Sequence, residues 1–418
     1  MVKKILVVVD SINIEDSSGS KANVALINNL DEAGFEVLVY HYTRKDIQLK
    51  NIKTFSVPEI KSSFNYFLSR FFRVVNRNFK INFTPFFEKR FGFSFTFFND
   101  VQSIIKALKK QSFEPDLVLT LSKGASFRPH YAVLKLPHLH DKWMAYVHDP
   151  FPFHYYPRPY NWIEPGYDKK EIFFREISEK AKYSAFPSQL LKEWMSSYFS
   201  NFEKTGIIIP HQNAKYEIQN NNFPTYFNAA KFNILHAGNL MKQRPPKGLL
   251  EGFNTFLKKN PEARSNSSLI LLGNAGDHTE VLDFFQKEIP ELYAYNGNKT
   301  FDEVFLIQKN ASVNVILESK SEVSPFLPAK FAHCVEANKV ILSLAPYYSE
   351  TRRLLGNDYP YWSEVDQAEK IAEIIEDLYQ LWKKNPLSLN LNRRDLEDYL
   401  SSDYLKKVIN KDYFKDAI

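Results

Sequence analysis

The chain has 418 residues, of which 44% are hydrophobic and 24% are charged. That length exceeds one hydrophobic core and, at about 150 residues per domain, predicts two or three domains. The balanced composition, without low-complexity tracts or short repeats, excludes a disordered chain and a solenoid, and the modest formal charge of +6 does not indicate nucleic acid as a partner.

The expected compartment follows from the cysteine count and the apolar runs. The single cysteine, Cys334, excludes an intramolecular disulfide and a cysteine metal cluster, which favours a reducing compartment. The first apolar run, Ile5 to Val9, ends at Asp10, too early for the core of a signal peptide. No later stretch reaches the ~18 apolar residues of a spanning helix. We therefore expect a cytoplasmic protein, free or peripheral at the inner face of a membrane.

The first half of the chain predicts a parallel sheet. Residues 5–9 form a strand buried on both faces, a polar loop follows over 11–20, and a helical pattern runs to Leu30. Gly34 ends that helix, and 35–41 is the next strand. Because this order is a βαβ unit, the loop lies at the carboxyl edge of the sheet, where ligands bind. Further strands are predicted over 116–121, 143–147, 184–186 and 206–209.

The second half repeats this pattern after a polar, Asn-rich linker over 211–231. Strands are predicted over 232–236, 268–272, 293–295, 311–316 and 340–344, and helices over 248–256, 281–288, 301–308, 331–337, 369–382 and 394–409. We expect an N-terminal domain over 1–212 and a C-terminal domain over 213–394, with a helix in 395–418 packing back on the first. Their carboxyl strand edges would line an interdomain cleft.

The motifs of the second half resemble those of the retaining glycosyltransferases called family four, which have the GT-B fold. The run ILHAGNLMKQRPPKGLLEGF, residues 234–253, is similar to the family's glycine turn and basic loop. The resemblance implies an α/β fold of two Rossmann-like, doubly wound domains facing a central cleft. It also implies that Arg244 and Lys247 bind the donor diphosphate, whose developing charge a guanidinium and an ammonium stabilise. The alternative is that both are solvated loop cations.

Other motifs of the same half imply further donor contacts. The glycine turn supplies Gly238 and Asn239, the run LILLGNAGD supplies Gly273 and Asn274, and the loop after the next strand supplies Asn298 and Lys299, unless it is an ordinary loop. The run SPFLPAKFAHCVEANKVILSL resembles the family's Ser-Pro and Pro-x-Lys loop entering a helix, a natural phosphate site. It adds the candidates Ser324, Pro325, Lys330 and His333.

Two features of this region depart from the family pattern. His333 stands where the family has a glutamate that binds the ribose hydroxyls, which puts the donor preference and catalysis in question. Glu318 and Glu322 do not match the family's paired-glutamate spacing, and we expect both to be exposed loop carboxylates.

The first half supplies three candidates. Gly19 lies in a loop that resembles the family's glycine loop, although Ser18 replaces one of the two usual glycines. His148 and Asp149 end a predicted strand, and the resemblance implies that they reach the sugar or the acceptor. A His-Asp pair orients a hydroxyl or accepts its proton. The alternative is a structural pair that packs on the tyrosines at 155 and 156.

Residues 61–98 are rich in phenylalanine and in arginine and lysine, with Glu88 as the single acid. One interpretation is peripheral contact with an anionic membrane, which would deliver a lipid-linked acceptor. The interpretation that we favour from sequence is a set of core phenylalanines on helices that cover the first sheet. Stacking on single-stranded nucleic acid is a remote third.

Together these patterns predict an enzyme that transfers a hexose-like unit from a nucleotide diphosphate sugar to a glycan, lipid-linked or protein acceptor. The resemblance implies retention at the anomeric carbon, no metal and no tightly bound cofactor. The main alternative is a degenerate member that binds a nucleotide or glycan without catalysis. A sugar-nucleotide epimerase and a glycan phosphorylase share the two-domain layout and are weaker alternatives.

Overall fold

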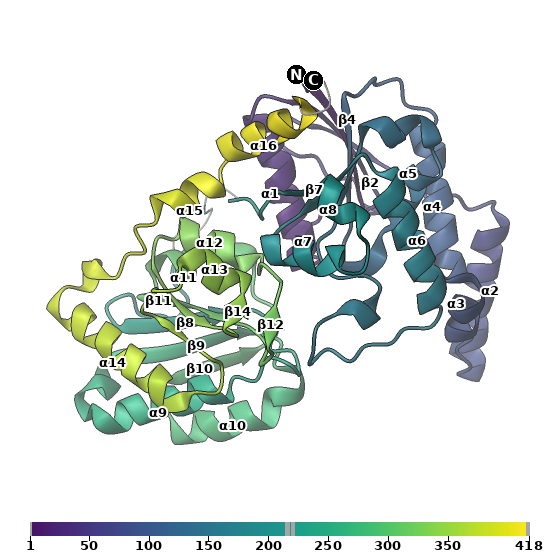
Figure 1. The fold of residues 1–418 in the computed structure, drawn as a ribbon. Helices are drawn as coiled ribbons and strands as arrows, with labels where there is room; N and C mark the ends of the chain where they lie inside the picture. The colour runs from purple at the N-terminus through teal and green to yellow at the C-terminus, as the bar shows by residue number, and fades with distance from the viewer. Residues whose placement is uncertain (1, 214–217, 219–221, 415–418) are drawn as a thin grey trace. The chain divides into compact units, whose positions relative to one another are not determined.

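The computed structural model describes residues 2–213, 218 and 222–414 (Figure 1). The chain divides into two compact units. The first comprises Met1–Tyr156, Tyr160–Ala214 and Leu400–Ile418, and the second comprises Pro157–Pro159 and Lys215–Tyr399. The predicted linker over 211–231 lies partly outside the described residues.

The first unit contains a seven-stranded parallel sheet in the order β3-β2-β1-β4-β5-β6-β7. Its strands are β1 (Lys4–Val9), β2 (Glu36–His41), β3 (Lys53–Ser56), β4 (Leu117–Leu121), β5 (Trp143–Tyr146), β6 (Tyr183–Phe186) and β7 (Gly206–Ile208). Its helices are α1 (Ser18–Glu32), α2 (Phe64–Phe79), α3 (Thr84–Phe91), α4 (Phe95–Leu108), α5 (Arg128–Leu134), α6 (Tyr167–Lys180), α7 (Gln189–Ser196), α8 (Asn201–Thr205) and α16 (Ser402–Phe414).

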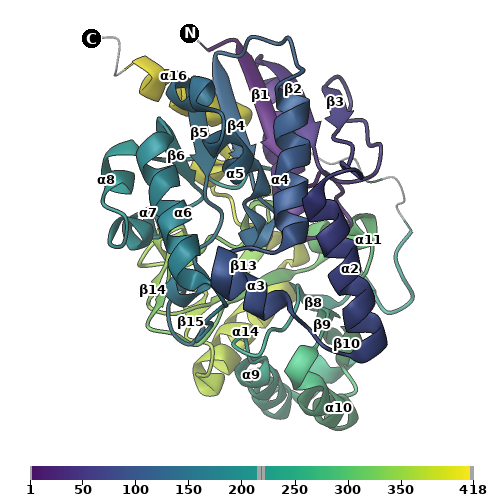
Figure 2. The same ribbon diagram turned by 90° about the vertical axis from the view of Figure 1, so that its right-hand side faces the viewer.

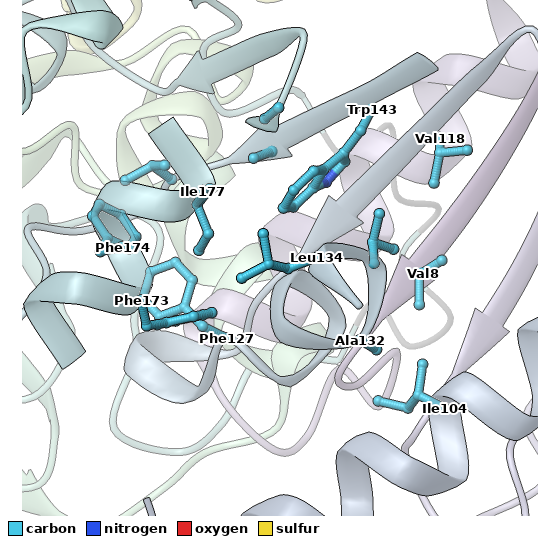
Figure 3. Close-up of a cluster of buried hydrophobic side chains, with 14 of the residues drawn as sticks. Val8, Ile104, Val118, Phe127, Ala132, Leu134, Trp143, Phe173, Phe174 and Ile177 are labelled. Atoms are coloured by element: carbon cyan, nitrogen blue, oxygen red, sulfur yellow. The ribbon is translucent and has the colours of Figure 1, made fainter. Parts of the chain in front are cut away.

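Strand β1 is apolar from Ile5 to Val9 because both faces of the strand are buried there. Leu6 and Val8 belong to the core on one face of the sheet, whereas Val7 and Val9 belong to the core on the other. Since successive side chains of a strand point to opposite faces, a strand covered on both sides has no polar position. Figure 3 shows part of the first core, in which Trp143 from β5 lies near Leu134 from α5. On the opposite face, the last helix contributes Leu405 to the second core.

The second unit contains a six-stranded parallel sheet in the order β10-β9-β8-β11-β13-β15, and a small parallel pair of β12 with β14. Its strands are β8 (Phe232–Ala237), β9 (Ser267–Gly273), β10 (Leu292–Asn296), β11 (Val313–Leu317), β12 (Val323–Ser324), β13 (Val340–Leu344), β14 (Tyr348–Ser349) and β15 (Trp362–Ser363). Its helices are α9 (Lys247–Lys259), α10 (Thr279–Glu288), α11 (Phe301–Asn310), α12 (Lys330–Glu336), α13 (Glu350–Leu355), α14 (Ala368–Lys384) and α15 (Arg394–Tyr399).

The predicted fold class, α/β with two doubly wound parallel sheets, is confirmed. The sequence analysis did not predict β3, β12, β14 and β15, which have two to four residues each. Strands of that length carry too few positions for an alternating or continuous apolar pattern to be recognised.

The interpretation of residues 61–98 as core helices is wrong for α2 and α3. Neither helix has a buried residue, and several of their phenylalanines are exposed to solvent. Helix α4 is the one that covers the sheet, and it buries Phe97, with Phe93 just before it. Figure 2 views the first unit from the side on which α2, α3 and α4 face the reader. The spacing of the phenylalanines in α2 is helical, but the apolar stripe is directed outward.

Candidate functional site

Two glycine turns meet at the carboxyl ends of β8 and β9. Gly273 has a φ of +142°, and a Cβ added to it would lie 2.5 Å from the carbonyl oxygen of Gly238. A hydrogen bond also ties the two turns, because the backbone amide of Asn274 donates to the side-chain Oδ1 of Asn239 at 2.9 Å. The structure thus brings together Gly238, Asn239, Gly273 and Asn274, as predicted for a surface that a ligand approaches closely.

Lys330 lies directly over this turn. It is the first residue of α12, and a Cβ added to Gly238 would lie 3.1 Å from its Cε and closer still to its Nζ. Glycine at this position therefore makes room for the ammonium group. Burial and, after it, the charge of Arg244 together lower the pKa of Lys330 to about 7. Since α12 has only seven residues, the cation itself, rather than a long helix dipole, is the feature that would attract an anion.

Arg244 belongs to the same cluster. It lies in the loop before α9, and its Nε is buried without a hydrogen-bond partner among the residues that the structure describes. Its charge acts on Lys330, on Glu318 and on His236 in β8. Burial and these two cations hold the pKa of His236 well below its usual range, so its imidazole is neutral. The cluster thus combines two cations, Arg244 and Lys330, whose charges would attract an anionic ligand.

Glu318 is a member of the cluster that the sequence analysis missed. We expected an exposed carboxylate, but the side chain is buried at the end of β11 and accepts a hydrogen bond from the hydroxyl of Ser324. Burial raises the pKa of Glu318 to about 7, against the lowering effects of that hydrogen bond and of Arg244. Its position immediately after an apolar strand was the available signal. Glu322, in contrast, is exposed as expected.

Lys247 is not brought to this cluster. Its side chain is 66% exposed and its Nζ lies 3.6 Å from Oε1 of Glu251, one turn along α9. It lines a shallow surface hollow with Phe284 and Phe285 of α10. The structure therefore separates the two cations that the sequence analysis paired, and sets Lys330 beside Arg244 instead.

The loop after β10 places Lys299 against aromatic rings. Its ammonium lies 4.2 Å from the ring centre of Tyr295 and 5.0 Å from that of Tyr226, and it pairs with Glu303 at 3.2 Å. The side chain of Asn298 is exposed. A backbone hydrogen bond of 3.3 Å from residue 297 to Gly273 connects this loop to the glycine turns. Lys299 is thus fixed by protein contacts at the rim of the cluster.

The remaining candidates of the second unit surround α12. Ser324 and Pro325 are buried, and the hydroxyl of Ser324 is used by Glu318. The ring of His333 lies against Phe301 and Phe305, with centroid distances of 5.3 and 5.8 Å. The position that resembles the family's glutamate therefore holds a histidine ring packed on aromatic rings, and it supplies no anionic side chain.

In the first unit, the carboxyl ends of β1 and β4 hold a buried acid. Asp10 accepts hydrogen bonds from the hydroxyl of Ser126 and, at 3.1 Å, from the amide of Lys123. Burial raises its pKa to about 6, although Arg128, 3.8 Å away, lowers it. Gly19 lies in the first turn of α1, where an added Cβ would be 3.6 Å from the amide nitrogen of residue 124. The predicted loop over 11–20 was therefore too long: it ends before Ser18, and Gly19 lies in α1, close to the loop after β4.

His148 and Asp149 follow β5 at the same carboxyl edge. The ring of His148 packs on Tyr146, with centroids 4.4 Å apart, and stacks at 5.9 Å on His211. Burial, with the charges of the neighbouring histidines, holds the pKa of His148 well below its usual range. A neutral imidazole is a proton acceptor at neutral pH. Among the described residues, no group of three or more His, Cys, Asp or Glu side chains is arranged to bind a metal ion.

Comparison with known proteins gives structural likeness only. Neither a protein-family model nor a curated sequence matches the chain. The N-terminal domain of trehalose-6-phosphate phosphatase from Candida albicans is 14% identical with a TM-score of 0.63, covering 100% of this chain and 98% of that one. The Anabaena protein HepE, in complex with UDP and glucose, is 9% identical with a TM-score of 0.59 and coverages of 99% and 100%.

A third similar structure is an α,α-trehalose-phosphate synthase (UDP-forming) from Burkholderia xenovorans in complex with glucose-6-phosphate. It is 9% identical with a TM-score of 0.58, covering 98% of this chain and 99% of that one. At such identities the likeness shows the fold alone, which is the GT-B architecture of two Rossmann-like domains. The narrower resemblance to glycosyltransferase family four stays a prediction.

Proposed function

We propose that the chain is a hexosyltransferase that uses a nucleoside diphosphate sugar and binds its diphosphate through Arg244 and Lys330. One observation carries the proposal: two cations from different segments converge on a glycine turn at the carboxyl ends of parallel strands. Phosphate oxygens are the ligands that a guanidinium and an ammonium bind best when both approach an open backbone turn. In a sheet of this type, that edge is where nucleotides bind.

The chemistry that these residues would support is transfer of a glycosyl group. The bond from the anomeric carbon to the diphosphate breaks, a bond to the acceptor oxygen forms, and the acceptor hydroxyl loses its proton. Arg244 and Lys330 stabilise the charge that develops on the departing diphosphate. The first unit has its own candidates: the neutral imidazole of His148 can accept a proton, and Asp149 is the candidate that orients a hydroxyl.

The solved structures of the same fold suggest the first substrates to try. HepE was crystallised with UDP and glucose, and the Burkholderia xenovorans enzyme is UDP-forming and was crystallised with glucose-6-phosphate. We therefore propose UDP-glucose as the first donor to test. For the acceptor we propose a glycan or a lipid-linked sugar, as in polysaccharide biosynthesis, with retention at the anomeric carbon, without a required metal and in the cytoplasm.

The test is ligand-induced thermal stabilisation with UDP, GDP, ADP, CMP and their sugars, because a ligand that binds only the folded state raises Tm. Arg244→Gln and Lys330→Met should abolish the shift that one nucleotide produces. Lys247→Gln is the matched control, since it removes a cation that is separate from the cluster, and it should keep the shift. Loss of the shift in Lys247→Gln but not in Lys330→Met would overturn this assignment of the second cation.

A second candidate function, binding of the nucleotide without transfer, is favoured by one observation. His333 presents a ring packed on phenylalanines where a carboxylate would bind the ribose. Release of UDP from UDP-glucose, by transfer to water or to added sugars, separates the two functions. Nucleotide binding without any release in both the parent protein and His333→Glu, with glycan and lipid-linked acceptors supplied as well as water, would favour the binding protein over the transferase.

A further inference from the structure

Helices α2 and α3 carry an exposed surface that is both aromatic and cationic, here called the α2–α3 face. On α2 the exposed apolar side chains recur every three or four residues, as one stripe. They include Phe64, Phe67 and Phe71, which are 75%, 62% and 59% exposed. The complete set of exposed apolar residues is Phe64, Phe67, Phe71, Val74, Phe79, Ile81, Phe83, Phe86 and Phe91.

The contacts between the two helices centre on Phe72 and Phe87. The ring of Phe72 lies 4.5 Å from that of Phe87, which in turn lies 4.9 Å from Phe95 at the start of α4, and the exposed Phe83 lies 5.6 Å from Phe72. None of the stripe residues of α2 belongs to the core of the first unit. A contiguous apolar surface of this kind, bordered by polar residues, marks an interaction site.

The charges of the face have one sign. Its exposed cations are Lys61, Arg73, Arg77, Lys80, Lys89 and Arg90. None of these forms an ion pair within the part of the chain that the structure describes. The single acid, Glu88, is turned inward and lies 3.6 Å from the buried ammonium of Lys170. The acid before α2, Glu59, is also engaged, by Arg70 at 3.1 Å. The outer surface therefore attracts anions without opposition.

We propose that the α2–α3 face binds the surface of an anionic lipid bilayer. Phenylalanines reach the boundary between headgroups and acyl chains, while arginine and lysine contact lipid phosphates. None of the helices among the described residues is long and apolar enough to cross a membrane, so the contact would be interfacial. A second copy of the chain fits less well, because a symmetric dimer through this face would bring its cations together.

An ionic network connects the face to the carboxyl edge of the first sheet. Arg70 of α2 binds Glu59, which lies 3.5 Å from Arg44. Arg44 binds Asp100 at 2.8 Å, and Arg128 bridges Asp100 and Asp10, at 2.9 and 3.8 Å. Bilayer binding through α2 would therefore hold that edge beside the membrane. Delivery of a lipid-linked acceptor there rests on the proposed function, whereas the binding itself does not.

The test is flotation of the full chain with phosphatidylcholine vesicles that contain or lack phosphatidylglycerol. We expect binding to the anionic vesicles, and weaker binding as salt is added. The variant Phe71→Ser/Arg73→Gln should bind at least about fivefold more weakly. That is the loss expected from removing one interfacial cation alone, before the loss of the phenylalanine is counted. The control Phe284→Ser/Lys287→Gln changes an equally exposed phenylalanine, at 58%, and an exposed lysine on α10, and should bind as the parent does.

Three outcomes would overturn the inference: absence of binding to the anionic vesicles, equal binding to neutral vesicles, and unchanged binding of the α2 variant. If vesicle binding is absent and the protein forms a dimer that Phe71→Ser/Arg73→Gln dissociates, the face is a self-association surface instead. Both changed residues are exposed, so the variant should retain the Tm of the parent. It should also retain the nucleotide-induced shift, which separates failure of this inference from failure of the proposed function.

Discussion

If a nucleotide sugar binds at Arg244 and Lys330 as proposed, its affinity should depend on pH in a direction that the pKa of Lys330 determines. In the free protein, burial and Arg244 lower the pKa of Lys330 to about 7. A bound diphosphate favours the ammonium and raises that pKa again. Affinity is therefore complete below pH 7 and falls as the pH rises through 7. If the pKa is about 7, the protonated fraction changes about tenfold between pH 6 and pH 8, which is about 1.4 kcal/mol of binding free energy.

Glu318 acts in the same direction. Its pKa is raised to about 7, so it becomes anionic over the same pH interval and repels the diphosphate. UDP-glucose is the appropriate ligand, because its diphosphate has no proton to lose between pH 6 and pH 8. The expected result for the parent protein is thus a decrease in affinity of at least about tenfold from pH 6 to pH 8, accompanied by proton uptake on binding.

Titration calorimetry in buffers of different ionisation enthalpy measures both quantities. Lys330→Met should bind more weakly at pH 6 and show a smaller pH dependence, which remains because of Glu318. Glu318→Gln should retain the part that belongs to Lys330. Affinity that is constant, or that increases, between pH 6 and pH 8 in the parent protein would refute the placement of these two groups beside the diphosphate.

Three further predictions concern stability. Lys330→Met should raise the Tm of the ligand-free protein at pH 7, because it removes a buried cation. The lowered pKa of Lys330 shows that burying its charged form costs free energy. An unchanged or lower Tm would contradict this prediction. Gly273→Ala should lower the unfolding free energy by about 2 kcal/mol in urea titration, since its Cβ meets the facing turn at 2.5 Å at a positive φ. Arg128→Met should cost about 3 kcal/mol at pH 7 by leaving Asp10 and Asp100 buried without their shared cation. For Asp10 alone, this loss should shrink below pH 6 as the carboxyl group takes up a proton, and guanidinium titrations at pH 5 and pH 7 measure the difference.

Much of the fold could be predicted because its signals are local. A strand covered on both faces must be apolar where it is buried, as β1 is from Ile5 to Val9, and a helix on a sheet has its own period. The glycine turns at Gly238 and Gly273 were predicted for the same reason, since a strand followed by glycine fixes where the carboxyl edge lies. What the sequence does not encode locally is which side chains from different turns meet there.

The pairing of the cations is the main example. Arg244 and Lys247 are three residues apart, but Lys247 is the first residue of α9, and its exposed side chain pairs with Glu251 of the same helix. Lys330 reaches Gly238 from another helix, 92 positions along the chain. The outward stripe of α2 has a similar cause. Phenylalanines at 64, 67 and 71 have the same spacing on a core helix and on a surface helix. Only the packing of α4 against the sheet decides that α2 lies outside it.

The titration of Lys330 and Glu318 limits the number of charges that the cluster holds, because the pKa of each is about 7. Near neutral pH, the lysine can lose its proton or the carboxyl group can keep one, so the cluster avoids holding several buried charges at once. A diphosphate that enters favours a protonated lysine and a protonated glutamic acid together. Proton uptake on binding is then the direct signature that the ligand, and not the fold alone, completes the charge balance of this site.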